Sequence, residues 1–328
     1  MHASENRPDQ TVGQIGEMAL IRRIAHWLGP TNPLEPEGIG DDCAVFQVEA
    51  GLPQLVTTDP VIARYHFDAS VAPEWVGAKL LKRNISDIAA MGGRPRRAVL
   101  SLALPSATAL DWLERFFRGL RESAEEYGVR VVGGDVAQTD GPAAAYLTLL
   151  GDAPAGRALT RRGARAGDPL FVTGELGGSL AEHHYRFRPR VEEGVWLAGR
   201  PEVRAMIDVS DGLAKDLPAL LPSGCQAALE WDALPVRDSV TTAGDKAAGW
   251  CRALTDGEDY ELLFAIDGRA SIDRFVRDWR ASFPCRLTRI GTIETASASG
   301  PPGIRLPPGY PELEKLAAYE HFRPGPDG

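Results

Sequence analysis

Aspartate recurs along this chain beside glycine, serine or threonine, where short apolar runs end. The instances are GIGDD (38–42), TTD (57–59), ISD (85–87), GGD (133–135) and IDVSD (207–211), and the acidic turn DGEDYE (256–261) adds a sixth. Carboxylate oxygens are the hard ligands that Mg²⁺ prefers, and protein-bound Mg²⁺ commonly bridges to substrate phosphates. Small neighbours let backbone N–H groups approach an anion closely. The pattern predicts a site where metal ions and phosphates meet.

Ordinary turn chemistry is the alternative explanation of each motif. Asp before Gly is common in turns, and Ser-Asp or Asp-Gly often caps a helix. Asp211, directly before Gly212, is also the type of residue expected at the N-cap of a helix over 212–221. Five such motifs in both halves of one chain nevertheless favour a shared site. The sequence contains neither G-x-x-x-x-G-K-[ST] nor a strand-linked G-x-G-x-x-G.

Nucleophilic catalysis has little support in the sequence. No G-x-S-x-G motif is present. His183 and His184 are adjacent on a predicted helix, so they cannot face one ligand together, and we expect them at the surface or in packing. His66 follows the TTD run and can reach the same site, whereas His321 is expected to pack the C-terminus.

The composition excludes some classes of partner. The chain has 328 residues, and 45 acidic against 36 basic side chains give a formal net charge of −9. A dedicated nucleic-acid or anionic-membrane binder needs a basic surface, so we expect neither. The four cysteines are widely spaced, and the polar start has no apolar signal segment. Both features predict a cytoplasmic protein.

Strand-like and helix-like runs alternate in both halves, which predicts an α/β or α+β fold with two domains. A basic stretch rich in small residues, 153–167, is the predicted boundary between domains 1–152 and 153–328. Helices are predicted at 16–29, 73–91, 109–127, 176–184, 211–221 and 271–283, and strands at 44–48, 55–58, 97–105, 129–135, 143–152, 169–174, 203–210, 260–266 and 285–293. Residues 293–312 are predicted to form a long loop.

Taken in order, the motifs resemble those of the bacterial thiamine-monophosphate kinase family. The matching segments between residues 13 and 322 are GIGDDCAVF, TTDPVIARYHFD, NISDIAAMGGRP, GGD, GRALTRRGARAGDPLFVTGELG, FRPRVEEG, IDVSDGLAKDL, DGEDYELLF and YEHF. The wider superfamily includes aminoimidazole ribonucleotide synthetase and selenophosphate synthetase.

The resemblance implies an N-terminal α/β domain that binds ATP and Mg²⁺ and pairs its sheet with that of a second copy in a homodimer. A C-terminal α/β domain would complete the active site. The implied reaction is direct in-line transfer of a phosphoryl group from ATP to thiamine monophosphate, assisted by several Mg²⁺ ions. Because the acceptor is an ionised phosphate oxygen, positioning and charge neutralisation are the main requirements, and no catalytic side chain is expected.

Site residues follow from the resemblance position by position. The implied metal ligands are Asp42, Thr57, Thr58, Asp59, Asp87, Asp135, Asp208 and Asp211. The implied ATP-binding residues are Gly134, Asp135, Arg161 and Ser210, and those for thiamine monophosphate are His66, Glu258 and Leu316.

This chain departs from the family pattern at a few positions. Leu316 stands where an aromatic side chain is expected, and Lys82-Arg83 replaces a small apolar pair. Two alternatives therefore stay open. One is a related ATP-dependent enzyme acting on another small acceptor, and the other is a non-catalytic nucleotide-binding protein.

Overall fold

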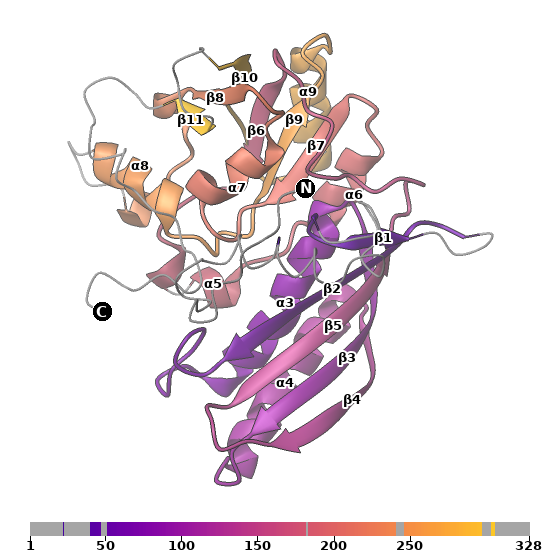
Figure 1. Cartoon of the computed structure of the whole chain (residues 1–328), viewed down its shortest axis with the longest axis vertical. Helices are drawn as coiled ribbons and strands as arrows, with labels where there is room; N and C mark the ends of the chain where they lie inside the picture. Colours follow the sequence, from indigo (N-terminus) through magenta and orange to yellow (C-terminus); the bar gives the residue numbers. More distant parts are fainter. Residues whose placement is uncertain are drawn as a thin grey trace, which may run out of the picture.

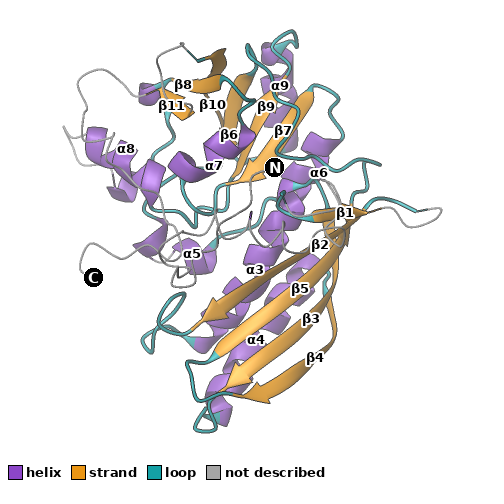
Figure 2. Ribbon diagram, in the orientation of Figure 1, coloured by secondary structure: helices purple, strands orange, loops and turns teal. Residues whose placement is uncertain are grey.

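The computed structural model of the chain describes residues 22, 40–46, 51–181, 183–240, 246–296 and 303–305. The predicted helix at 16–29, Leu316 and the closing YEHF lie outside the described residues, apart from Arg22. Two sheets, each with its own helices, make up the described part (Figures 1 and 2).

The N-terminal sheet is five-stranded, in the order β1-β2-β5-β3-β4. Only β3 and β4 pair in parallel; the other neighbours are antiparallel. The strands are β1 (Ala44–Phe46), β2 (Gln54–Ile62), β3 (Arg94–Leu104), β4 (Arg130–Gln138) and β5 (Ala144–Asp152). Two long helices, α3 (Pro73–Ala90) and α4 (Leu110–Tyr127), cover one face and lie behind the sheet in Figure 1.

Alternating side chains explain why this sheet buries only one face. In β2, Leu55, Thr57 and Val61 are buried, while Thr58 between them is exposed. The helices on the buried face approach each other closely because both carry glycine at the crossing. A Cβ on Gly77 would lie 2.0 Å from the Phe116 carbonyl oxygen, and one on Gly119 would lie 1.9 Å from that of Glu74.

The C-terminal sheet is six-stranded, in the order β11-β8-β10-β6-β9-β7. Its strands are β6 (Pro169–Thr173), β7 (Val203–Asp208), β8 (Cys225–Leu229), β9 (Leu262–Ile266), β10 (Leu287–Thr295) and β11 (Gly303–Arg305). Its helices are α5 (His183–Arg186), α6 (Val191–Ala198), α7 (Leu213–Leu220), α8 (Lys246–Thr255) and α9 (Ile272–Ser282). β6 and β9 are buried on both faces, which explains their unbroken apolar sequences.

The mixed α/β fold with two sheets confirms the predicted fold class. The aspartates that end the short apolar runs do not all stand at the ends of elements. Asp87 lies inside helix α3, and Asp59 and Asp135 lie within β2 and β4. Strand β8 and helices α6 and α8 were not predicted, because their sequences lack a clear apolar period. The loop predicted over 293–312 is wrong in part, because β10 extends to Thr295 and β11 spans Gly303–Arg305.

Candidate active site

A cleft of about 490 Å³ lies between the two halves of the chain. Strand β2 and helix α3 of the N-terminal unit form one side of it. The segment after β7 (Ser210, Asp211) and the loop before β9 form the other. Acidic residues dominate the lining: Asp41, Asp42, Asp59, Asp87, Asp211, Asp256 and Glu258. A cleft of this size and charge suits a polyanionic ligand only when cations lie between the two.

Three carboxylates converge at one end of the cleft. Asp42, Asp87 and Asp208 each offer an oxygen, and these oxygens lie within 4.8 Å of one another. Thr57 Oγ1 donates a hydrogen bond to Asp87 Oδ2 (2.5 Å), and Ser86 Oγ donates one to Asp208 Oδ2 (2.5 Å). We call Asp42, Asp87 and Asp208 the carboxylate cluster. It joins a loop before β1, helix α3 and the end of β7.

Burial, and next the crowding of negative charge, perturb the pKa values of this cluster. Burial, and next the charge of Asp42, raise the pKa of Asp208 to about 7. Burial and the nearby Asp59 and Asp208 raise the pKa of Asp87 well above its usual range. Such shifts mean that the ionised forms are unfavourable here, first because of burial and then because of the neighbouring acids, and that a bound cation is favoured. Three hard oxygen donors within reach of one point fit Mg²⁺.

Arg161 connects the cluster to the loop that precedes the second sheet. Its Nη2 donates to Asp42 Oδ1 (2.7 Å), and its backbone N–H donates to Asp41 Oδ2 (3.1 Å). Burial, and next the charge of Asp42, raise the pKa of Asp41 to about 7. Arg161 is therefore a cation beside the cluster that an incoming phosphate can also contact.

A second arginine lies on the α3 wall. Arg83 Nε donates to Asp59 Oδ2 (3.0 Å), and Arg83 Nη1 donates to the Pro60 carbonyl oxygen (2.6 Å). Burial raises the pKa of Asp59, and the Arg83 guanidinium acts in the opposite direction. Asp59 is not one of the three carboxylates in the cluster.

The other end of the cleft holds a carboxylate with its own cation. Lys79 Nζ lies 2.8 Å from Glu258, and His184 Nδ1 lies 2.6 Å from Glu258 Oε2. Burial works against ionisation of Glu258, but the hydrogen bonds from His184 and Lys79 prevail and lower its pKa to about 2. Burial lowers the pKa of Lys79 to about 8 despite its anionic partner. We call Lys79, His184 and Glu258 the Glu258 network.

Backbone strain fixes the loop that carries Glu258. Glu258 and Tyr260 have φ values of 52° and 53°, which non-glycine residues rarely adopt. The Glu258 N–H donates to the Ser210 carbonyl oxygen (2.7 Å), and the Tyr260 ring stacks on Phe187 at a centroid distance of 4.0 Å. The strain is held by these contacts, as is common at functional sites.

Most of the residues singled out in the sequence meet in this cleft. Those that line it are Asp42, Thr57, Thr58, Asp59, His66, Asp87, Arg161, Ser210, Asp211 and Glu258, and Asp208 joins them through the cluster. His66 lines the cleft, and its Nδ1 accepts a hydrogen bond from the Ile62 N–H (3.0 Å).

Gly134 and Asp135 lie elsewhere in the single chain. Both are exposed on β4, the outer strand, and β4 is three strands from β2. Three distances between neighbouring strands of a sheet amount to roughly 14 Å, so neither residue lines the cleft. A Cβ on Gly134 would lie 1.9 Å from the Leu100 carbonyl oxygen, which gives this glycine a packing role.

Two local predictions are corrected by the structure. Asp211 is not a helix cap: Gly212 is the N-cap of α7, and Asp211 Oδ2 lies 2.8 Å from Lys215 Nζ. His184 is not merely a packing residue, because it contacts Glu258. Lys79 and Asp41 were not singled out, although Asp41 directly precedes a chosen aspartate, and Arg83 was noted only as part of the Lys82-Arg83 departure and not as a site residue.

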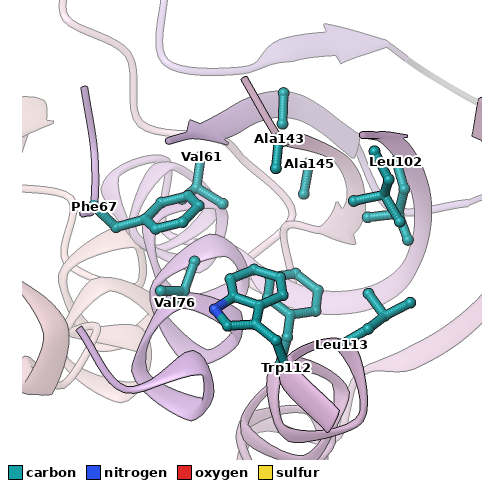
Figure 3. Close-up of a pocket in the computed structure, with 11 residues that line it drawn as sticks. Val61, Phe67, Val76, Leu102, Trp112, Leu113, Ala143 and Ala145 are labelled. Atoms are coloured by element: carbon teal, nitrogen blue, oxygen red, sulfur yellow. The ribbon is translucent and has the colours of Figure 1, made fainter. Parts of the chain in front are cut away.

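A small apolar cavity of about 10 Å³ lies under the N-terminal sheet. Figure 3 shows its lining, in which Phe67 stacks on Trp112 at 5.8 Å between ring centroids. Its size and apolar walls make it a packing void of the core. Among the described helices, none is long and apolar enough to cross a membrane.

Known proteins resemble this chain over most of its length. Residues 40–152 match the family model for AIR synthase related protein, N-terminal domain. Thiamine-monophosphate kinase of Rhodopirellula baltica is 36% identical over 82% of this chain and 88% of that protein. The enzyme of the same name from Salmonella typhimurium is 34% identical over 94% and 98%. A solved structure described as AaThiL complexed with AMPPCP and TMP superposes with a TM-score of 0.77 at 27% identity, covering 96% of this chain and all of that one.

Proposed function

This chain belongs to the thiamine-monophosphate kinase family, and we propose that it transfers the γ-phosphoryl group of ATP to thiamine monophosphate, giving ADP and thiamine diphosphate. The relatives that carry this name match nearly the whole chain, and a structural neighbour was solved with AMPPCP and TMP. The observation that carries the proposal is the cleft in which the carboxylate cluster, Arg161 and the Glu258 network meet.

We propose that Asp42, Asp87 and Asp208 hold Mg²⁺, with Thr57 keeping Asp87 in place. When bound, Mg²⁺ supplies positive charge between two polyanions that would otherwise repel each other. Asp211 and the hydroxyl of Thr58 also face the cleft and are further candidate ligands. We assign Arg161 and Ser210, which line the same cleft, to the phosphates of ATP.

Glu258 and His66 are the residues we assign to thiamine monophosphate. Both residues line the cleft, and their side chains belong to its end away from the carboxylate cluster. The acceptor phosphate then extends from this end of the cleft toward the carboxylate cluster. With donor and acceptor aligned, no general base is needed, because the acceptor oxygen is already ionised.

A homodimer is the proposed assembly. The whole outer strand β4 is exposed, and Val132 (57%), Val136 (68%) and Tyr146 (45%) are apolar side chains open on this sheet. An exposed edge with apolar residues ordinarily pairs or is covered. Gly134 and Asp135 would then lie at the interface, where a role toward ATP depends on the second copy. The variant Val136→Lys should run as a monomer in light scattering, and an unchanged dimer would refute this interface.

A cytoplasmic location is part of the same proposal. Cys43 and Cys225 are buried free thiols, which suits a reducing compartment. Cell fractionation with an antibody to the chain tests this directly, and recovery from an extracellular or periplasmic fraction would refute it.

The experiment that tests the function is a coupled assay with purified protein, ATP, Mg²⁺ and thiamine monophosphate. We expect stoichiometric thiamine diphosphate and ADP, with no product when Mg²⁺ is chelated. ATP turnover that requires a different phosphorylated acceptor would overturn the substrate assignment and leave the ATP site in place.

A further inference from the structure

Arg83 places a fixed positive charge inside the cleft. It stands on α3, one turn before Asp87 of the carboxylate cluster, and its side chain is only 14% exposed. Its partner Asp59 belongs to β2, and both residues line the cleft. The side chain therefore crosses from the helix to the strand that forms the adjacent wall.

Two bonds hold the guanidinium in this position. Nε binds Asp59 Oδ2 at 3.0 Å, and Nη1 binds the Pro60 carbonyl oxygen at 2.6 Å. A backbone carbonyl does not move without the strand that carries it, so the cation is anchored independently of Asp59. Asp59, Glu258 and Asp87 all act on Arg83 electrostatically, which places its charge among the main anions of the cleft.

We propose that Arg83 is a resident cation that takes the place of a divalent ion at Asp59, so that Asp59 is its counter-ion and not a metal ligand. This inference rests on the proposed function, because it concerns how the same cleft neutralises phosphate. The carboxylate cluster keeps its metal, whereas the Asp59 side is neutralised by the protein itself.

Competition between Arg83 and a divalent metal ion for Asp59 supports the proposal. A guanidinium cannot lose its proton, so a metal ion at Asp59 would have to share the carboxylate with a permanent positive charge at contact distance. Displacing Arg83 would instead leave a mostly buried charge without its carboxylate partner, which is strongly unfavourable. Arg161 differs, because its partner Asp42 also faces two further carboxylates, Asp87 and Asp208, that a metal ion can bridge.

Metal counting tests the proposal without any turnover. Equilibrium dialysis of the full chain against saturating Mn²⁺, followed by elemental analysis, gives the number of ions per chain. We expect Arg83→Leu to bind one ion more than the unaltered chain, because Asp59 becomes available. Asp59→Asn alone should leave the number unchanged, and the double variant should return to the unaltered number.

Two variants separate a charge effect from damage to the fold. Arg83→Lys keeps a cation at the site and should keep the unaltered number of ions. Lys82→Leu removes the neighbouring charge on α3, outside the cleft lining, and should also leave the number unchanged. Circular dichroism checks that each variant is folded.

The proposal is overturned if Arg83→Leu binds no additional ion, or if Asp59→Asn alone loses one. If the kinase assay fails but Arg83→Leu still binds one more ion than the unaltered chain, only the substrate assignment is overturned. A chain that binds no Mn²⁺ with or without Arg83 would refute both the metal site and the role of Arg83.

Discussion

The two ends of the cleft treat buried negative charge in opposite ways. In the carboxylate cluster, Asp87 and Asp208 face other acids, and their pKa values are raised. In the Glu258 network the carboxylate faces Lys79 and His184, and its pKa is lowered to about 2. One end therefore needs a cation from outside, whereas the other carries its own. The end with the carboxylate cluster therefore depends on bound metal, whereas at the end with the Glu258 network the protein's own side chains neutralise the carboxylate.

The largest expected effect comes from Asp87→Asn. Loss of this ligand should lower kcat by on the order of 10³-fold, about 4 kcal/mol of transition-state stabilisation. The same change should raise the metal-free melting temperature, because it removes repulsion within the cluster. Kinetics with and without added Mg²⁺ and thermal melts in a chelator measure the two effects.

Asp111→Asn, at an exposed aspartate of α4, is the matched control and should change neither quantity. If Asp87→Asn left turnover unchanged, Asp87 would be removed from the metal site and the division of the cleft would fail.

Glu258→Gln should have the opposite effect on stability. Lys79 is 1% exposed in its side chain, and the substitution leaves this cation without its anion. We expect the free energy of unfolding to fall by about 3 kcal/mol, and added Mg²⁺ should not restore it. Urea unfolding at pH 7 measures the loss. A variant as stable as the unaltered chain would mean that the Glu258 network is not a resident ion pair.

The pH dependence of that loss has a definite sign. The pKa of Glu258 falls from 4.5 in the unfolded chain to about 2 in the folded chain. A lowered carboxyl pKa adds stability that is fully present above pH 4.5 and is lost as the pH falls toward 2. The difference in unfolding free energy between the unaltered chain and Glu258→Gln should therefore be smaller at pH 3 than at pH 7. An equal difference at both values would contradict the assignment.

His184→Gln should have the smallest effect of the set. Lys79 still neutralises Glu258 in this variant, so we expect a loss of about 1 kcal/mol, the usual contribution of one hydrogen bond. Urea unfolding in parallel with Glu258→Gln ranks the two residues. A larger loss than that of Glu258→Gln would show that His184, and not Lys79, is the main partner.

The sequence predicts the anions of this site far better than its cations. Asp42, Asp87 and Asp208 belong to the recurring acidic motifs that contain glycine, serine or threonine, and these motifs mark them. Lys79 stands among apolar residues of a helix, and nothing local distinguishes it from a solvated lysine. Arg83 is marked only as a departure from the family pattern, which does not say what it contacts. Their roles depend on the distance between α3 and β2 or the loop before β9, which only the packed chain defines.

The same limit applies to the fold. Strong helical periods predicted α3, α4 and α9 closely, and the interleaving of strands and helices predicted the fold class. The predicted helix over 73–91 already contained Asp87, but sequence alone could not tell that Asp135 lies on an outer strand, because the order of strands in a sheet is set by partners distant in the chain.

Anomalous diffraction from crystals grown with Mn²⁺ and a non-hydrolysable ATP analogue tests the division of the cleft most directly. We predict an anomalous peak between Asp42, Asp87 and Asp208, and the Arg83 guanidinium still bound to Asp59 with no peak at that carboxylate. A peak at Asp59 with Arg83 displaced, or no peak within the carboxylate cluster, would contradict the account.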